Sequence, residues 1–279
     1  MGLRQKIGAK RGIANMTDAV AALQAENVKM TFGETKALDN VSLTIGTGEM
    51  VALIGPSGSG KSTLLRVAAA LQTADSNSGP VSVLGKVMQK NGKISSGVRA
   101  NRARLGFIFQ QFNLVGRLTL FANVMLGALG RLPAWRGALG LFPTDVKQSA
   151  MDALERVGIA EFAGRRASNL SGGQQQRGAI ARSLVQGAQV LFADEPIASL
   201  DPVSARKVME LLRELNQTDG LSVVVTLHQV DYAQKFCDRT VALNKGRIVY
   251  DGPSDGLSRE KLVEIYGPEF ETAFHGGES

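Results

Sequence analysis

The chain has 279 residues, 44% of them hydrophobic, so it is long enough to bury one large core or two small ones. Its only cysteine is Cys237, which excludes a framework of disulfide bonds. No apolar run reaches the roughly 18 residues that a membrane-spanning helix needs, and we expect the chain to lie in the cytosol. The formal net charge of +7 suits a phosphate ligand, an anionic membrane surface or nucleic acid, and charge alone does not choose among them.

The first segments predict a tail followed by antiparallel strands. Residues 1–22 are rich in basic side chains and lack a hydrophobic period, so we expect a mobile basic arm; a solvated tail is favoured over weak attraction to anionic lipid. Alternating segments around Val28–Phe32 and Val41–Ile45 predict the strands. Phe32 stands at the end of the first strand, where its ring could stack on a nucleobase, although a phenylalanine in a strand is more often part of the core.

A G-x-x-x-x-G-K-S pattern lies between a predicted buried strand, Met50–Ile54, and a predicted helix, Lys61–Leu71. The pattern and the residue after it comprise Gly55, Pro56, Ser57, Gly58, Ser59, Gly60, Lys61, Ser62 and Thr63. Backbone N–H groups and the positive end of the helix dipole converge at such a loop, which favours a polyphosphate. Lys61 would then reach the outer phosphates, and the Ser62 hydroxyl would reach a Mg²⁺ ion.

Much of the chain's positive balance of charge lies in one block, because residues 77–143 contain no acidic side chain. The block's nine basic residues are Lys86, Lys90, Lys93, Arg99, Arg102, Arg104, Arg117, Arg131 and Arg136. Nucleic-acid binding is not excluded by charge, but no recognition helix, zinc spacing or aromatic-basic ladder accompanies the block. We therefore favour a solvated face or a surface near lipid headgroups.

The same block predicts several elements. Residues 81–87 predict one short strand, and residues 105–109 predict another that ends at Gln110. Residues 120–129 and 145–157 predict helices, and an apolar connector over residues 131–143 joins them. Exposed apolar segments mark contacts with partners or membranes, and folding back on the same domain stays an alternative.

A second glycine-bearing turn begins another predicted helix. Ser171 and Gln174 form an S-x-x-Q capping box around Gly172 and Gly173, and an apolar helical stripe follows. The turn is therefore a helix N-terminus that a ligand could approach closely. An ordinary capped helix explains the pattern equally well, so the residues alone leave both interpretations open.

Two adjacent carboxylates follow the apolar run Val190–Ala193, which predicts a strand. Asp194 and Glu195 would lie at the carboxyl end of this strand, the edge where parallel sheets bind ligands. Beside a phosphate loop, Asp194 can hold the Mg²⁺ shell and Glu195 can accept a proton from water. Further on, Asp201 is expected to cap a helix that has Pro202 at its first position.

The last predicted parallel strand, residues 221–226, ends close to His228. A lone histidine is more often structural, but at this edge it could hydrogen-bond a terminal phosphate. Residues 241–243 and 248–251 predict a hairpin. Residues 258–266 predict a short helix before a loose tail.

Taken in order, these motifs resemble those of the ATP-binding subunits of ABC transporters over residues 23–252. The matching segments are a Walker A loop at Gly55 to Ser62, a Q-loop at Gln110, a signature at Leu170 to Gln174, a Walker B motif with Glu195, a D-loop at Ser199 to Asp201 and a switch at His228. The chain is most similar to ATPase subunits of phosphonate importers, on residues 194–202, residues 226–233 and the connector. Importers of phosphite or another oxyanion and the ATPase subunits of exporters remain alternatives; a soluble non-transport ABC protein is less favoured.

The resemblance implies an α/β fold, a P-loop NTPase with a RecA-like and mostly parallel sheet, an antiparallel β subdomain and an α-helical subdomain. The nucleotide-binding domain would span residues 23–255, with the helical subdomain at about 111–170, and residues 256–279 would form a short helix and a tail. ATP and Mg²⁺ are the implied ligands. Two copies of the chain would clamp each ATP between the Walker A loop of one and the Ser171–Gly173 turn of the other.

The resemblance also implies individual roles. Phe32 would stack on adenine, Glu195 would be the general base, His228 would hold the γ-phosphate, and Gln110 would bind the metal and link it to the transporter contact. Gln174 and Asp201 complete the implied ATP-binding set. The implied partners are a second copy of the chain, transmembrane permease subunits and, indirectly, an extracytoplasmic solute-binding protein, with no nucleic acid. The chain would lie peripherally at the cytoplasmic face of the inner membrane.

Overall fold

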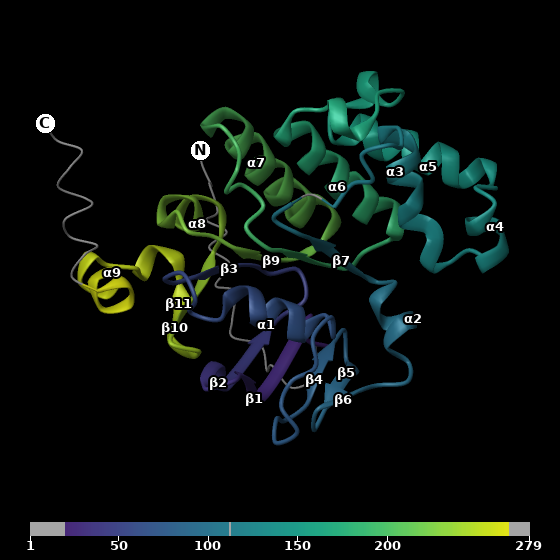
Figure 1. Ribbon diagram of the computed structural model, residues 1–279. Helices are drawn as coiled ribbons and strands as arrows, with labels where there is room; N and C mark the ends of the chain where they lie inside the picture. The colour runs from purple at the N-terminus through teal and green to yellow at the C-terminus, as the bar shows by residue number, and fades with distance from the viewer. Residues whose placement is uncertain (1–19, 112, 268–279) are drawn as a thin grey trace, which may run out of the picture.

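The computed structural model describes residues 20–111 and 113–267. Two sheets and a group of helices form its layers, with α1 between the sheets (Figure 1). Residues 1–19 of the predicted arm and the predicted tail from residue 268 onward lie outside the described residues.

The first sheet is antiparallel and has the strand order β2-β1-β4-β5-β6. Its strands are β1 (Leu23–Phe32), β2 (Thr35–Ile45), β4 (Val81–Val83), β5 (Lys86–Lys90) and β6 (Lys93–Ile94). The predicted antiparallel pair is confirmed, but the single strand predicted over residues 81–87 is wrong. Leu84 and Gly85 both have positive φ, 50° and 70°, and form a two-residue turn that folds this segment into a hairpin.

The second sheet has the order β11-β10-β3-β9-β8-β7. Its strands are β3 (Met50–Ile54), β7 (Leu105–Ile108), β8 (Val190–Ala193), β9 (Ser222–Thr226), β10 (Arg239–Asn244) and β11 (Arg247–Pro253). All neighbours pair in parallel except β10 and β11, which form the predicted hairpin. The strand at 221–226 is confirmed, but it is not the last parallel strand, because β10 also pairs in parallel with β3.

The parallel strands are apolar runs because both of their faces are covered. Every residue of β3, β8 and β9 is buried. Along β3, Val51 and Leu53 pack toward α1 and the antiparallel sheet, whereas Ala52 and Ile54 pack into the core on the opposite side. The core that contains Ala52 and Ile54 also contains Cys237. Burial raises the pKa of the Cys237 thiol to about 12, so Cys237 is a packing residue and not a reactive thiolate.

Two of the helices end earlier than the sequence predicts. Their bounds are α1 (Lys61–Ala68), α2 (Val98–Arg102), α3 (Leu120–Met125), α4 (Ala134–Ala138), α5 (Thr144–Arg156), α6 (Gly172–Gln186), α7 (Pro202–Asp219), α8 (Val230–Phe236) and α9 (Arg259–Tyr266). The helix predicted to reach Leu71 ends at Ala68, because Ala70 has a positive φ of 52° and Arg102 donates to the carbonyl of Ala69. The helix predicted to reach Leu129 continues as a 3-10 turn after Met125.

The apolar connector lies at an outer corner of the molecule, where Figure 1 shows α4 beyond α5. Trp135 and Leu139 are 57% and 68% exposed, so these side chains do not fold back on the domain, whereas Phe142 packs partly against the core. Among residues 20–111 and 113–267, every helix is too short or too polar to cross a bilayer.

Candidate functional site

Four functional segments meet at one edge of the parallel sheet. The phosphate loop follows β3, Asp194 and Glu195 follow β8, His228 follows β9, and Gln110 follows β7. These four strands are adjacent in the sheet and parallel, so their carboxyl ends share one edge. This is the edge where open α/β sheets bind ligands.

Close backbone packing shapes the phosphate loop. A Cβ atom on Gly55 would lie 2.0 Å from the carbonyl oxygen of Leu243, and one on Gly60 would lie 2.3 Å from that of Ala37. Both glycines have positive φ, 137° and 106°. Gly60 is the N-cap of α1 and offers no side-chain cap, so the loop and the first turn of α1 present backbone donors to a ligand.

Lys61 points into this loop. Its Nζ donates to the carbonyl oxygens of Gly55 and Pro56 at 2.7 and 3.0 Å, and the residue is 4% exposed. Burial lowers the pKa of the ammonium, and the carboxylates of Glu195 and Asp194 oppose that shift. The positive charge is therefore held where a phosphate chain bound by the loop would neutralise it.

Asp194 accepts from side chains of two elements, α1 and β9. Its Oδ1 accepts from the Ser62 hydroxyl at 2.6 Å and the Thr226 hydroxyl at 3.1 Å, and its Oδ2 lies 3.4 Å from the Arg66 guanidinium. Asp194 is 2% exposed. Its carboxylate and the Ser62 hydroxyl form an all-oxygen set that fits Mg²⁺, which keeps few protein ligands and completes its shell with water and phosphate. No cluster of three His, Cys, Asp or Glu side chains suited to a metal occurs in the described part of the chain.

Glu195 and His228 form a pair beside the loop. His228 Nε2 lies 2.6 Å from Glu195 Oε1. The turn that carries Glu195 has a positive φ of 50° at this residue, and its N–H donates to the Thr226 hydroxyl at 2.7 Å. Thr226 thus fixes both carboxylate-bearing residues from the neighbouring strand.

A cavity of about 290 Å³ brings these groups together. It is lined by the loop from Ser57 to Thr63 and by Phe32, Ala37, Glu195 and His228. Phe32 is 48% exposed, so this phenylalanine is not part of the core. An aromatic face, a phosphate loop, a carboxylate and an imidazole on one cavity suit a nucleoside polyphosphate and its hydrolysis.

Other predicted site residues lie outside this cavity. Gln110 is exposed and does not line it, although the Asp194 N–H donates to the carbonyl of Ile108, two residues earlier. The Ser171–Gln174 turn does not line it either. Asp201 caps α7 as predicted; hydrogen bonds, chiefly from Ser204, lower the pKa of its carboxyl.

The capping box at the start of α6 is present. The Gln174 N–H donates to Ser171 Oγ at 3.3 Å, and the Ser171 N–H donates to Gln174 Oε1 at 2.9 Å. A Cβ atom on Gly173 would lie 2.9 Å from Cβ and Oγ of Ser204, so the first turns of α6 and α7 are in close contact. This contact gives Gly173 a packing role beside any role in ligand binding.

Sequence reasoning missed two residues that hold the site. Thr226 could have been found, because a polar residue at the end of a buried apolar strand, two positions before His228, marks the ligand edge. Tyr266, whose hydroxyl accepts the N–H of Gly55 at 3.1 Å, gave no local signal. Its role depends on packing between residues 211 positions apart.

This fold and site define an ATPase of the ABC type, and the chain belongs to the ABC transporter family, whose model matches residues 38–198. Over 264 residues it is 81% identical to the "Phosphonates import ATP-binding protein PhnC" of Maricaulis maris, covering 95% of this chain and 100% of that protein. It is 61% identical over 261 residues to the protein of the same name in Caulobacter vibrioides, covering 94% and 98%.

Solved structures of cassettes match the fold. The dimeric post-hydrolysis state of the ATP-binding cassette MJ0796, bound to ADP and Pi, has a TM-score of 0.72 and 34% identity, covering 84% of this chain and 99% of that one. The Clostridium perfringens protein cbiO1, part of the transporter complex cbiONQ, has a TM-score of 0.73 and 26% identity, covering 91% and 99%. The expected fold class and the resemblance to ABC ATPases are confirmed.

Proposed function

We propose that this chain is the ATPase subunit of an ABC importer for phosphonate. The observation that carries the substrate is the 81% identity with a phosphonate import ATP-binding protein over nearly the whole chain. The observation that carries the reaction is the cavity that joins the phosphate loop, Glu195 and His228.

The chain's own residues supply the steps of hydrolysis. The loop amides and Lys61 bind the phosphate chain of ATP, which places the γ-phosphate toward Glu195 and His228. Glu195 accepts a proton from the attacking water, and His228 hydrogen-bonds the γ-phosphate after its 2.6 Å contact with Glu195 opens. Mg²⁺ would be held by Ser62 and Asp194, with Gln110 as the further ligand that the motif implies, and would neutralise developing negative charge on the phosphates.

A second copy of the chain completes the site. The Ser171–Gln174 turn is a helix N-terminus with two glycines, and it lies outside the cavity of its own chain. The cassette MJ0796, which is 34% identical, is dimeric in its post-hydrolysis state. Both facts support a dimer in which each Ser171–Gln174 turn faces the ATP of the partner chain. Asp201 would lie close to that ATP as well, because it caps α7 beside Ser204, which is in contact with Gly173.

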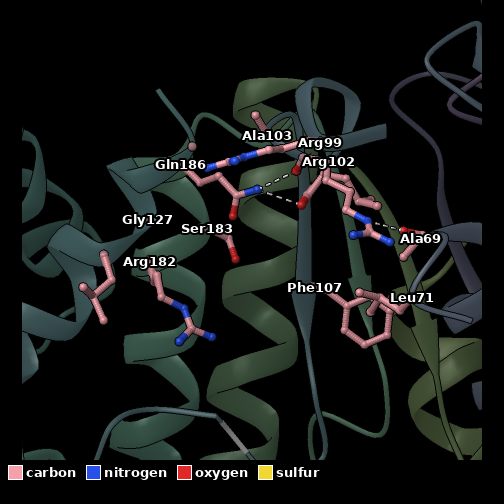
Figure 2. Close-up of a pocket in the computed structure, with 13 residues that line it drawn as sticks. Ala69, Leu71, Arg99, Arg102, Ala103, Phe107, Gly127, Arg182, Ser183 and Gln186 are labelled. Carbon is pink, nitrogen blue, oxygen red and sulfur yellow. Dashed lines mark hydrogen bonds between the residues drawn. The ribbon is translucent and has the colours of Figure 1, made fainter. Parts of the chain in front are cut away.

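The permease subunits dock, we propose, at a larger cavity of about 410 Å³. Figure 2 shows its walls: Arg99 and Arg102 belong to α2, Phe107 to β7, and Gly127 and Arg182 to the helical layer. The cavity thus lies between the parallel sheet, whose edge forms the proposed ATP site, and the helices around α6. Phe107 lies three residues before Gln110, so a segment seated here is close in sequence to the end of β7.

The charge of this cavity favours an acidic helix or loop as its occupant. The cavity has three arginines and no acidic residue in its lining. Arg102 is held by the carbonyl of Ala69, and Arg182 donates to that of Asn113. Arg99 is exposed and free to meet a carboxylate of the permease. Such docking would hold the chain peripherally at the cytoplasmic face of the membrane.

The substrate is tested with the reconstituted complex of this chain, its permease subunits and the extracytoplasmic binding protein. We expect a phosphonate-loaded binding protein to stimulate ATP hydrolysis and uptake, and phosphite or phosphate to do so weakly. Stimulation by phosphite or another oxyanion alone would reassign the substrate. Movement of ligand outward would make the complex an exporter.

The docking site is tested with Arg99→Glu, and Lys93→Glu is the matched control because Lys93 is exposed in the same acid-free block but outside the cavity. Arg99→Glu should leave the ATPase rate of the isolated chain unchanged and reduce its recovery with the permease. Equal recovery of both variants would contradict docking at this cavity.

A further inference from the structure

The last helix of the described chain ends against the phosphate loop. The backbone N–H of Gly55, the first glycine of the loop, donates to the phenol oxygen of Tyr266 in α9 at 3.1 Å. Burial raises the pKa of this phenol, so Tyr266 is neutral at physiological pH and its oxygen stays an ordinary hydroxyl acceptor. The contact joins α9 to the first residue of the phosphate loop, at the ligand-binding edge of the sheet.

Tyr266 is fixed by packing that does not involve the loop. Leu262 and Ile265 of α9 are buried in the core, with 7% and 1% of their surface exposed. The side chain of Asn244, at the end of β10, donates to the carbonyl of Ile265 at 3.0 Å. The packing of α9 and its hydrogen bond with Asn244 therefore fix the position of the phenol oxygen next to Gly55.

Gly55 transmits this constraint to the phosphate-binding lysine. On one side its N–H is held by Tyr266, and on the other its carbonyl oxygen accepts from Lys61 Nζ at 2.7 Å. The Gly55 backbone also packs closely on β10, because an added Cβ atom would lie 2.0 Å from the Leu243 carbonyl oxygen. Gly55 is thus held from three directions.

We infer that Tyr266 is a positioning residue of the nucleotide site. Its hydroxyl fixes Gly55, the first residue of the phosphate loop. Because the Gly55 carbonyl accepts from Lys61, the hydroxyl also helps to position the Lys61 ammonium. The inference rests on ATP as the ligand of this loop and extends the site to the C-terminal helix. Tyr266 does not line the cavity, so it acts on ATP through the loop and not by contact.

Tyr266→Phe tests the role, because it removes the hydroxyl and keeps the ring. One backbone hydrogen bond of this kind changes an equilibrium by about twofold to tenfold, and we expect the KM for ATP and the Kd of the nucleotide to rise by that factor. We expect kcat to stay within about twofold, since Glu195 and His228 are unchanged. The Gly55 amide should also exchange its proton faster by NMR.

Tyr250→Phe is the matched control. The Tyr250 hydroxyl also bonds to a backbone group, but as a donor: it donates to the Pro253 carbonyl at 2.6 Å, on β11 and outside the cavity. Its variant should lose similar thermal stability without a change in KM. Asn244→Ala, which loosens the support of α9, should raise KM in the same direction as Tyr266→Phe.

Two results would overturn the role of Tyr266. One is a KM in Tyr266→Phe equal to that of Tyr250→Phe at equal loss of stability. The other is faster exchange of the Gly55 amide with no change in nucleotide affinity. Failure of the unaltered chain to bind ATP would instead contradict the assignment of the loop, so the two failures are distinguishable.

Discussion

The N-termini of α1 and α6 are both helix starts with glycines, and they differ in how their free N–H groups are satisfied. The N-cap of α1, Gly60, has no side chain to cap it, and its loop lines the cavity with Lys61. The N-cap of α6, Ser171, exchanges two hydrogen bonds with Gln174 and lies outside that cavity. The first helix start leaves its donors for a ligand, whereas the second satisfies part of its own.

The difference teaches that glycines at a helix start do not by themselves define a phosphate site. At α1 the adjoining groups make the chemistry: a buried ammonium, a buried carboxylate and the Glu195–His228 pair surround the loop. At α6 the close contact of Gly173 with Ser204 has a structural explanation that needs no ligand. Assigning α6 to ATP therefore requires a second chain, and the following experiments separate the two helix starts.

The largest effect is expected from Glu195→Gln, which acts only on the α1 side. The amide cannot accept a proton from water, so we expect hydrolysis to fall by about 10²- to 10⁴-fold while ATP affinity is kept. ATP should then trap a dimer, detectable by light scattering. Glu264→Gln is the control, because it makes the same change to an exposed carboxylate outside the cavity, one that pairs with Lys261 on α9. Normal hydrolysis in Glu195→Gln would remove this residue from the role of base.

The second effect tests whether the α6 turn acts on the partner's ATP. Gly173→Asp places a carboxylate at the turn, and Lys61→Ala disables the phosphate loop. In a trans arrangement, mixed heterodimers have one site with both lesions and one intact site, so about half of the wild-type rate per dimer returns if the sites are independent. The ATPase rate of isolated heterodimers is the measurement, with each homodimer as a reference.

The contact with Ser204 requires a control for this experiment. Asp at position 173 would press on the Ser204 side chain, so the same mixture is repeated with Ser204→Gly added to the Gly173→Asp chain. Each chain alone must still bind ATP. If a dimer forms and a single intact site proves active in a separate variant, then no recovery in the mixture excludes the trans arrangement.

A smaller effect is expected from Phe32→Ala, which removes the aromatic face of the α1 cavity. Stacking of a base on an aromatic ring contributes about 1–3 kcal/mol, so ATP affinity should fall by about 5- to 150-fold. Phe32→Tyr and Phe32→Trp should restore it, because any π-face suffices. Titration with a fluorescent nucleotide measures the change, and Val249→Ala is an exposed apolar control. Unchanged affinity in Phe32→Ala would exclude stacking.

The smallest effect is expected from Gln174→Ala, which removes half of the capping box of α6. We expect a loss of about 0.5–2 kcal/mol in the free energy of unfolding, measured by urea denaturation, because the Ser171 N–H loses its acceptor. ATP binding by the isolated chain should not change, since Gln174 lies outside its cavity. A fall in that affinity would place the two helix starts in one site of the same chain.

Local spacing predicted the parts of the site that neighbouring residues determine. The phosphate loop, the Ser171–Gln174 capping box and the cap at Asp201 are each formed within a few residues, so the pattern and the structure agree. The parallel strands were found because they are covered on both faces and are therefore uninterrupted apolar runs.

The remainder depends on contacts between distant residues. The Leu84-Gly85 turn lacks the Asn-Gly or Asp-Gly signal of a tight hairpin, so residues 81–87 resemble one strand. The parallel pairing of β10 with β3 joins segments nearly 190 positions apart, Val241 and Leu53 among them, and has no local mark. The contact of Tyr266 with Gly55 is of the same kind.

The hydrogen bonds of both helix starts have a consequence for the order of biogenesis. Ser171 and Gln174 exchange hydrogen bonds, and Lys61 is bonded to two loop carbonyls, so both helix starts already have their shape in a single chain without a nucleotide, although the donors of α1 stay available to a ligand. We expect newly made chains to fold first and to assemble later. A single cooperative melting transition of dilute, nucleotide-free protein would support this sequence of events, and a folded state that appears only after ATP is added would contradict it.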